Sequence, residues 1–250
     1  MIVPCYNEAM RISLDYWNQI IKETNTIDWI FVNDGSSDDT SKLLSQIAGG
    51  LGTTVLNLPK NKGKAEALRI GFLEATARNC EIIGLIDADG SFEKQEVIVL
   101  CQKFQNKCEW NSSQQSYDAI FMSRNFLLNG VESVSLIRKF SGFVISRINS
   151  AVWKELPKDT QCGFKFFRFN NKSKSTILMP FSNSWFFEIE FLIRLREIKR
   201  LPLSIKEMPL KFCKHIEGSK TDKSNTMNSV QQIFSTFCKL VSFRLRNFRF

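Results

Sequence analysis

The chain has 250 residues, of which 43% are hydrophobic and 24% are charged, as is typical of a globular protein. This length allows one large α/β domain whose core is big enough to fold without disulfides or a structural metal. The formal net charge of +9 favours an anionic partner: a nucleotide, a nucleic acid or a membrane surface.

Cysteine usage and hydropathy bear on the cellular compartment. The seven cysteines are scattered and include no C-x-x-C pair, which favours reduced thiols over a disulfide framework or a zinc site. The sequence shows no signal peptide and no apolar run long enough to cross a bilayer. We therefore expect a cytoplasmic protein.

Strand-like and helix-like segments alternate over residues 1–122. Apolar runs predict strands at residues 1–4, 29–32, 53–58, 82–86 and 118–122. Apolar residues recur at helical spacing over residues 12–21, 43–47, 65–75 and 97–104. Ser36 or Ser37 is the expected N-cap of the second of these helices. The alternation predicts βαβ units and a doubly wound sheet.

The second half of the chain is less regular. We expect a helix over 131–156, a loop and strand over 158–167, a helix over 185–199 and a short strand over 205–212. The tail, residues 227–250, is amphipathic and basic. It could pack against the domain or lie in a membrane interface, and its composition leaves both open.

The apolar run of residues 82–86 ends in two carboxylates, Asp87 and Asp89, followed by Gly90 and Ser91. A run this apolar indicates a strand buried on both faces, and ligands of parallel sheets bind beyond the carboxyl ends of the strands. Two close carboxylates repel unless a cation neutralises them, so a divalent cation bridging to a phosphorylated substrate would fit. An ordinary turn explains the same residue types.

Two common nucleotide-binding fingerprints are missing. The sequence contains neither G-x-G-x-x-G nor G-x-x-x-x-G-K-[ST]. A dinucleotide-binding Rossmann domain and a P-loop therefore both lack their defining motif.

Eight segments together resemble family-two glycosyltransferases of the GT-A fold. The likeness is strongest to the branch that loads sugars onto polyprenyl phosphates, the dolichyl-phosphate glucosyltransferases and mannosyltransferases, and within it to the glucosyl-type enzymes. The segments are VPCYNE (3–8), VNDGSSDDT (32–40), NKGKAEALRIGF (61–72), DADGS (87–91), SR (123–124), DTQCGFKFF (159–167), WFFEIEFL (185–192) and IEGSK (216–220).

The chain departs from the family pattern in four places. The first strand is shorter than is usual in the family, which puts the centre of the sheet in doubt. Asn33 stands where Asp is common in the family, so the nucleotide-sugar contact at this position is assigned to Asp34. Ser91 stands where mannosyl-type members carry Gln, and Glu188 replaces the usual Asp.

The resemblance implies an α/β GT-A fold: a doubly wound, mixed and mostly parallel sheet with flanking helices. It implies one GT-A domain over 1–225, in which residues 1–125 bind the nucleotide sugar and residues 126–225 form the acceptor side. Residues 226–250 would be a basic amphipathic helix in peripheral contact with a membrane.

The resemblance also assigns roles to individual residues. Nucleotide-sugar contacts fall to Pro4, Tyr6, Glu8, Asp34, Lys64, Asp87 and Ala88. Phosphate and acceptor contacts fall to Arg124, Arg138, Gln161 and Lys220. Mg²⁺ or Mn²⁺ would be held by Asp87 and Asp89. The catalytic set implied is Asp89, Arg124, Arg138 and Glu188.

The implied reaction is an inverting, metal-dependent transfer of a hexose to a polyprenyl phosphate at the cytoplasmic membrane face. The donor would be UDP-glucose, or GDP-mannose in the mannosyl-type enzymes, and no nucleic acid would take part. An anionic lipid phosphate attacks without a general base. A saccharide hydroxyl needs one, and Glu188 or Glu190 would then be the candidate.

Two other classes remain as alternatives. The positive charge is compatible with a nucleic-acid-binding module, although only the tail combines basic and aromatic residues. The short first strand is compatible with a nucleotide-sugar-binding scaffold without activity.

Overall fold

A computed structural model describes residues 1–49, 52–106, 110, 116–124, 157–170, 173–182, 187–214 and 216. Within these residues, seven strands form one sheet in the order β3-β2-β1-β4-β6-β5-β7. The strands are β1 (Ile2–Cys5), β2 (Trp29–Asn33), β3 (Thr53–Asn57), β4 (Ile82–Leu85), β5 (Ala119–Ser123), β6 (Lys165–Arg168) and β7 (Ile205–Pro209). The helices are α1 (Leu14–Glu23), α2 (Thr40–Ile47), α3 (Lys64–Ala77), α4 (Lys94–Gln105), the 3₁₀ helix η2 (Ser173–Ile177) and α6 (Phe187–Lys199).

The sheet is mixed, and its strand directions bring the important loops to one edge. β1 is parallel to β2 and β4, and β5 is parallel to β7. β6 runs antiparallel to both β4 and β5, with Leu85 paired to Lys165. The start of β6 therefore lies where β4 and β5 end. The predicted doubly wound, mostly parallel sheet is confirmed.

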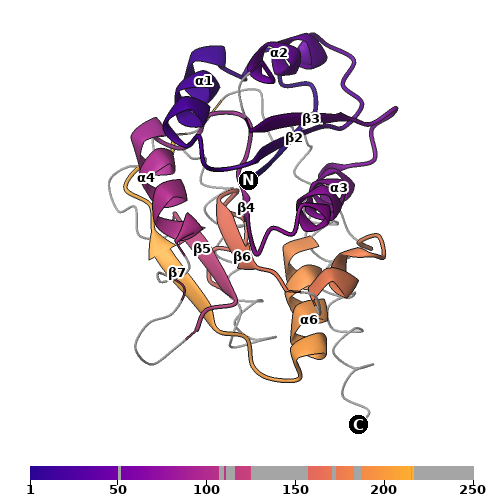
Figure 1. The fold of residues 1–250 in the computed structure, drawn as a ribbon, viewed down its shortest axis with the longest axis vertical. Helices are drawn as coiled ribbons and strands as arrows, with labels where there is room; N and C mark the ends of the chain where they lie inside the picture. The colour runs from indigo at the N-terminus through magenta and orange to yellow at the C-terminus, as the bar shows by residue number, and fades with distance from the viewer. Residues whose placement is uncertain are drawn as a thin grey trace, which may run out of the picture.

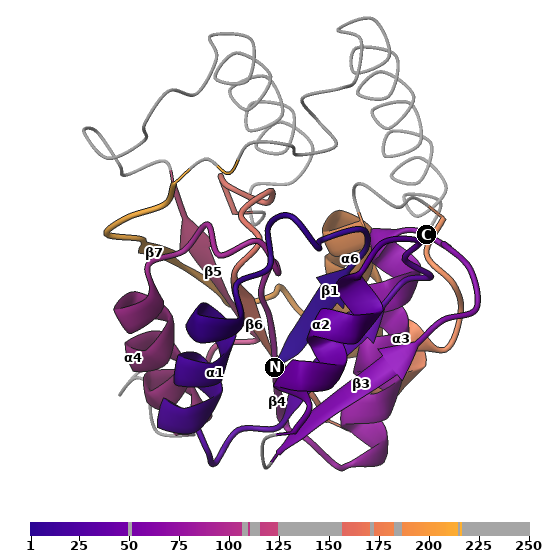
Figure 2. The same cartoon turned by 90° about the horizontal axis from the view of Figure 1, so that it is seen from above.

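Helices cover both faces of this sheet (Figures 1 and 2). On one face, α1, α2 and α4 bury an apolar cluster that includes Trp17, Leu44 and Phe104. On the other face, α3, α6 and η2 bury a second cluster that includes Phe72 and Phe191. The helical spacing of apolar residues in the sequence thus corresponds to helix faces packed on the sheet.

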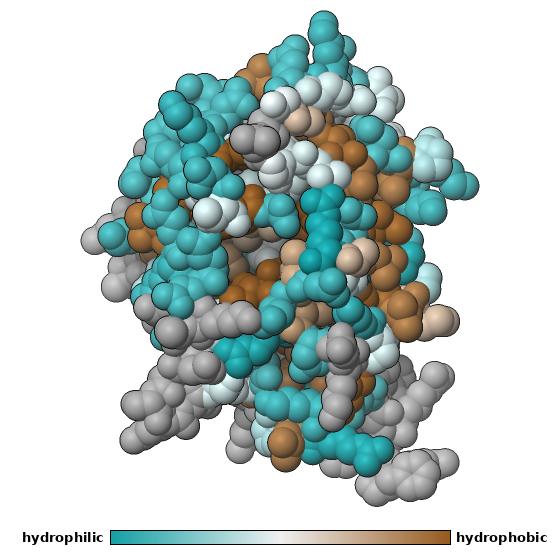
Figure 3. Space-filling model, viewed as in Figure 1, coloured by the Kyte–Doolittle hydropathy of each residue, from teal (hydrophilic) through white to brown (hydrophobic). Residues whose placement is uncertain are grey.

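Surface composition agrees with this layering. Figure 3 shows mostly hydrophilic residues over the outer faces of α1 and α4, while hydrophobic residues show in the hollow between the two helical layers. In the part of the chain that the structure describes, no helix is both long and apolar enough to cross a membrane.

The predicted N-cap of α2 is wrong. The helix begins after Asp39, and the side chain of Asp38 accepts from the backbone N–H of Thr40. Ser36 and Ser37 instead bind the loop that follows β1, because that loop lies beside them at the sheet edge. A contact with a distant segment has replaced the local cap.

Some expectations fall outside the described residues. These are the helix over 131–156 and the tail over 226–250, as well as part of the proposed acceptor half. The division of residues 1–225 into two halves stays a prediction. The helix expected over 185–199 is described from Phe187 onward.

Candidate active site

The loops after β1 and β2 are joined to each other at the carboxyl edge of the sheet. The backbone N–H of Asn7 donates to Ser36 Oγ at 3.0 Å, and that of Glu8 donates to Thr40 Oγ1 at 2.7 Å. In return, the Asn7 side chain accepts from the N–H of Ser37 at 2.9 Å. Asn7 adopts a φ of 53°, a conformation that Asn tolerates better than most residues. The two loops therefore form one rigid wall of the site.

Asp34, the last part of this wall, holds the loop that precedes α3. It is only 2% exposed, and its two carboxylate oxygens accept from the backbone N–H groups of Lys62 and Gly63, both at 2.8 Å. Gly63 is the N-cap of α3 and has a φ of 93°, which a β-carbon would strain. Asp34 thus fixes the point from which Lys64 projects. Sequence reasoning gave Asp34 a ligand contact, which stays a prediction, whereas the structure shows Asp34 holding this loop.

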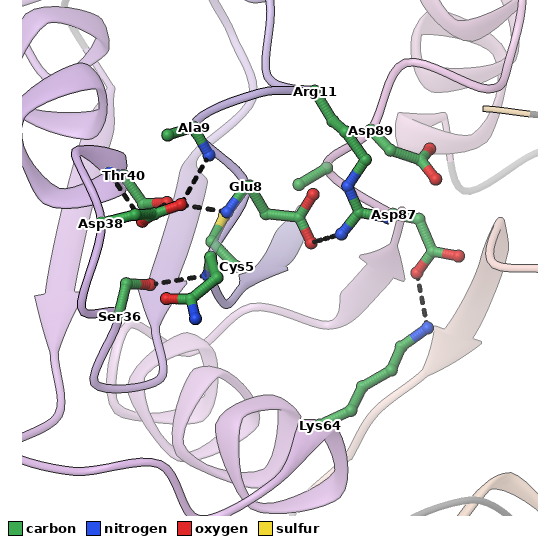
Figure 4. Close-up of polar contacts among 12 residues, drawn as sticks. Cys5, Glu8, Ala9, Arg11, Ser36, Asp38, Thr40, Lys64, Asp87 and Asp89 are labelled. Atoms are coloured by element: carbon green, nitrogen blue, oxygen red, sulfur yellow. Dashed lines mark hydrogen bonds and ion pairs between the residues drawn. The ribbon is translucent and has the colours of Figure 1, made fainter. Parts of the chain in front are cut away.

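Asp87 and Asp89 follow β4 on the opposite wall (Figure 4). Asp87 Oδ1 lies 2.5 Å from Nζ of Lys64, which crosses the edge from α3. Asp89 Oδ1 accepts from the backbone N–H of Ser91 at 3.0 Å. The Asp87 carboxylate also packs on Gly163, since a β-carbon at Gly163 would stand 2.0 Å from Asp87 Oδ2.

The two carboxylates have opposite pKa shifts. Burial raises the pKa of Asp87, but the adjacent Lys64 ammonium outweighs this, so the net pKa lies below the usual value. Burial raises the pKa of Asp89, and the negative charge of Asp87 raises it further. The two carboxylates therefore repel each other, and Lys64 neutralises Asp87 but leaves Asp89 with a raised pKa.

Helix α1 supports the loop that carries these acids. Trp17 Nε1 donates to the carbonyl of Ala88 at 3.1 Å, and Tyr16 Oη donates to the carbonyl of Phe92 at 3.0 Å. Ala88 is 3% exposed, so its side chain packs in the core while its carbonyl is bound. These bonds tie the acidic loop to the same helix layer that closes the core.

Arg11 is a charged residue of this site that sequence reasoning missed. Its guanidinium bonds Glu8 at 2.6 Å and lies between Glu8 and the loop of Asp87 and Asp89 (Figure 4). It is one of the groups that lower the pKa of Asp89, although burial and Asp87 dominate in the other direction. Its position shortly after the VPCYNE segment was the sequence signal that could have placed Arg11 in the site.

Arg124 directly follows β5, at the same edge of the sheet. Its Nε and Nη2 donate to the two oxygens of Asp159 at 2.9 Å each, and its backbone N–H donates to the same carboxylate. Burial raises the pKa of Asp159, but the bonds from Arg124 outweigh this and lower it. The Arg124 side chain remains 41% exposed. This orients a fixed cation toward solvent at the site edge.

Glu188 is bound to a buried lysine. Lys165 Nζ lies 2.5 Å from Glu188 Oε1, and the two side chains are 2% and 7% exposed. The ammonium also lies 5.6 Å from the ring of Phe121 and 5.8 Å from that of Phe187. Lys165 was inside a recognised segment but was given no role, because a lysine beside an apolar run ordinarily indicates a solvated strand end.

A narrow pocket connects this buried pair with the acidic edge. It is lined by residues of several elements, among them Pro4, Lys64, Asp87, Gly163, Lys165 and Glu188. The structure thus brings Pro4, Lys64 and Asp87, which were expected to contact the sugar nucleotide, beside Glu188, which was expected to be catalytic. Gly163 and Lys165, which had no predicted role, line the same pocket. Tyr6 lies half-buried at the start of the loop after β1.

The other predicted residues vary in how far the structure places them. Gln161 is half-buried, and its Nε2 has no hydrogen-bond partner within the described residues. Arg138 and Lys220 lie outside the described residues. Their proposed contacts with phosphate stay predictions.

The residues present fit a hard divalent cation bound together with phosphate. Asp87 and Asp89 offer carboxylate oxygens, and burial together with the charge of Asp87 raises the pKa of Asp89. Gly163 leaves the space that the Asp87 carboxylate needs. No cluster of three or more His, Cys, Asp or Glu occurs among the described residues. A two-carboxylate site matches Mg²⁺ or Mn²⁺ bridging to a diphosphate better than a closed protein cage.

The architecture places the protein in a known fold class. Glucosyl-3-phosphoglycerate synthase from Mycobacterium tuberculosis, solved with Mn²⁺, UDP-glucose and glycerol 3-phosphate, superposes with a TM-score of 0.60 at 18% identity. The match covers 95% of this chain and 79% of that one. The fold is therefore that of the GT-A enzymes, as expected.

Sequence comparison gives the family. The family model described as "Glycosyl transferase family 2" matches residues 1–171, and this chain belongs to that family. It is 31% identical over 224 residues to dolichyl-phosphate beta-glucosyltransferase ALG5C of Trichomonas vaginalis, over 83% of this chain and 63% of that protein. It is also 31% identical over 240 residues to dolichyl-phosphate beta-glucosyltransferase of Drosophila melanogaster, over 88% and 68%. The predicted family and branch are confirmed.

The chain spans about two thirds of the length of the curated relatives that it matches: 63% and 66% for the two from Trichomonas vaginalis.

Proposed function

We propose that this protein is an inverting glycosyltransferase that moves glucose from UDP-glucose to a polyprenyl or dolichyl phosphate. The relatives named above support the branch, and the edge of the sheet offers carboxylates and cations suited to a diphosphate and a second phosphate. The reaction would take place at the cytoplasmic face of a membrane, with the basic tail of residues 226–250 in peripheral contact.

The observation that carries this proposal is that the carboxylates that could act as a general base are paired with lysine or arginine side chains. Glu188 is bound to Lys165 at 2.5 Å in the protein interior. Glu190 accepts from Arg194 at 2.5 Å and from Ser182 at 2.8 Å, and Asp159 is held by Arg124. Glu190 and Asp159 are therefore engaged by cations, whereas Glu188 lines the pocket and keeps one oxygen, Oε2, without a hydrogen-bond partner within the described residues. A phosphate acceptor needs no base, so the pairing of these three carboxylates with cations is compatible with it.

The chain's own residues would bind and orient both substrates. The wall made by Tyr6, Glu8 and Asp34 would receive the nucleoside, and Lys64 would contact the diphosphate. Arg124, oriented by Asp159, would bind the acceptor phosphate through its planar donor fork. The acceptor oxygen would then attack the anomeric carbon from the face opposite to the leaving diphosphate.

A divalent cation bound by Asp87 and Asp89 would neutralise the charge that develops on the departing diphosphate. The protein's part is to hold the two carboxylates in place, through Gly163 for Asp87 and through the backbone of Ser91 for Asp89.

Transfer is tested with radiolabelled UDP-glucose, Mn²⁺ or Mg²⁺ and a short-chain polyprenyl phosphate, with GDP-mannose in parallel. We expect label in the organic extract from UDP-glucose. We expect Asp89→Ala to reduce transfer by on the order of 10²-fold, because charge stabilisation of the transition state is lost.

Asp15→Ala is the matched control, since Asp15 is an exposed carboxylate on α1, 91% accessible. It should keep the wild-type rate. Label that appears only on a soluble saccharide, or full transfer by Asp89→Ala, would contradict the proposed acceptor or the proposed role of Asp89.

A further inference from the structure

We propose that Lys64 is an exchangeable counter-ion of Asp87. It neutralises this carboxylate before the donor binds, and it moves to the donor's diphosphate when donor and divalent cation enter together. This inference rests on the proposed function, because it takes the anionic ligand to be a nucleoside diphosphate. It concerns how the site couples two ligands.

The Asp87 carboxylate is already neutralised in the structure. Oδ1 is 2.5 Å from Lys64 Nζ, and Oδ2 lies against Gly163, where a β-carbon would stand 2.0 Å away. A divalent cation that ligates Asp87 therefore meets the Lys64 ammonium at the same carboxylate, and the two positive charges repel each other. The ammonium and the divalent cation compete for one carboxylate.

The Lys64–Asp87 pair is built to exchange. The two side chains are 47% and 32% exposed, and an ion pair this open to solvent is weak. Lys64 carries its charge on a flexible four-carbon stem from the first residue of α3. The neighbouring Lys165–Glu188 pair is a contrast, because its side chains are 2% and 7% exposed and are locked among aromatic rings.

A new partner for Lys64 is available on the donor. A diphosphate bound beside Asp87 and Asp89 would lie close to the start of α3, because Lys64, the first residue of α3, reaches Asp87. Asp34 fixes that start by binding the backbone of Lys62 and Gly63. The amino end of a helix also favours negative charge. Lys64 would then exchange a carboxylate for a phosphate without crossing the site.

The exchange predicts a specific thermodynamic coupling. A divalent cation alone must displace Lys64 and leave it without its partner, so cation binding to the free protein is weakened. With the nucleoside diphosphate present, Lys64 regains an anion, and the weakening disappears. Cation and diphosphate therefore strengthen each other's binding by the same factor, as linkage requires.

The test measures Mn²⁺ binding to the full chain by electron paramagnetic resonance of free Mn²⁺, with and without saturating UDP. The proteins are wild type, Lys64→Met and Lys62→Met. We expect Lys64→Met to bind Mn²⁺ alone about two- to fivefold more tightly than wild type, the range that an exposed ion pair supplies. The factor by which UDP strengthens Mn²⁺ binding should fall in the same variant.

Lys62→Met removes an exposed positive charge from the same loop without touching Asp87, and it should behave as wild type. A Lys64→Met protein that binds Mn²⁺ no more tightly, or that keeps the full coupling to UDP, would overturn the exchange. An equal gain in Lys62→Met would also overturn it, because the effect would then be general charge. Failure of the wild type to bind either Mn²⁺ or UDP would contradict the proposed function itself.

Discussion

At the scale of single residues, the position of the Asp87 carboxylate depends on the absence of a β-carbon at Gly163. Gly163 has no side chain, and the Asp87 carboxylate fills that space. A β-carbon at Gly163 would lie only 2.0 Å from Asp87 Oδ2. From the sequence pattern alone, Gly163 would be interpreted as a turn residue. The contact exists because β6 runs antiparallel beside β4, which brings the DTQCGFK loop against the end of β4.

We predict that Gly163→Ala lowers the rate of transfer by on the order of 10²-fold, because the methyl group moves Asp87 and a displacement near 1 Å has that effect on reacting groups. The melting temperature should change little, since the contact is at the edge of the fold. Steady-state transfer assays and thermal melts check both parts.

Gly49→Ala is the control substitution, because its β-carbon would meet only an ordinary 3.7 Å contact with the carbonyl of Gln46. Unchanged transfer by Gly163→Ala would show that Asp87 tolerates movement, and the proposed role of its position would be wrong.

At the scale of elements, the buried Lys165–Glu188 pair joins β6 to the first turn of α6. A lysine and a glutamate are costly to bury, and each is tolerable only because the other is present. Helix α6 is held further by Arg194, which donates to the carbonyls of Thr176, Met179 and Pro180.

Lys165→Met should lower the free energy of unfolding by about 3–5 kcal/mol, because Glu188 is left buried without a counter-charge. Urea denaturation measures this. The double variant Lys165→Met with Glu188→Met should regain most of the loss, because no unpaired charge remains.

Lys199 gives the matched surface pair: its Nζ lies 2.7 Å from Asp118, with side chains 35% and 19% exposed. Lys199→Met should cost about 0–1 kcal/mol. A similar small cost for Lys165→Met would mean that the Lys165–Glu188 pair is solvated in solution.

At the scale of the whole molecule, the net charge of +9 is the property most relevant to where the protein acts. Among the described residues, no helix is long and apolar enough to cross a membrane. Basic residues close to an anionic surface contribute about 1 kcal/mol each, and this attraction is screened by salt.

We predict that the protein co-sediments with vesicles containing anionic lipid and that binding is lost when ionic strength rises from roughly 0.05 M to roughly 0.5 M. Replacing the basic residues of the tail with Gln should weaken binding strongly. These are Lys239, Arg244, Arg246 and Arg249.

An equal number of exposed lysines elsewhere provides the control, and they should matter less. These are Lys22, Lys42, Lys60 and Lys103. If both sets of replacements weaken binding equally, the tail has no special part in it.

The sequence by itself determined the alternation of strands and helices, the sheet edge that carries the site, and the acidic pair after β4. These features are local, because side-chain periodicity and strand-end chemistry act within a few residues. The family resemblance added Lys64 and Arg124 to the predicted site, and the comparisons bear out the family itself.

Only the tertiary structure decided which side chains meet. Lys64 and Asp87 are 23 positions apart, Lys165 and Glu188 are also 23 apart, and Arg124 and Asp159 are 35 apart. Ser36 and Ser37 were expected to cap a helix and instead bind the loop after β1. In each case the partner is set by strand order and direction. Neighbours in the sheet are distant in the chain, and no local pattern encodes which loops will share an edge.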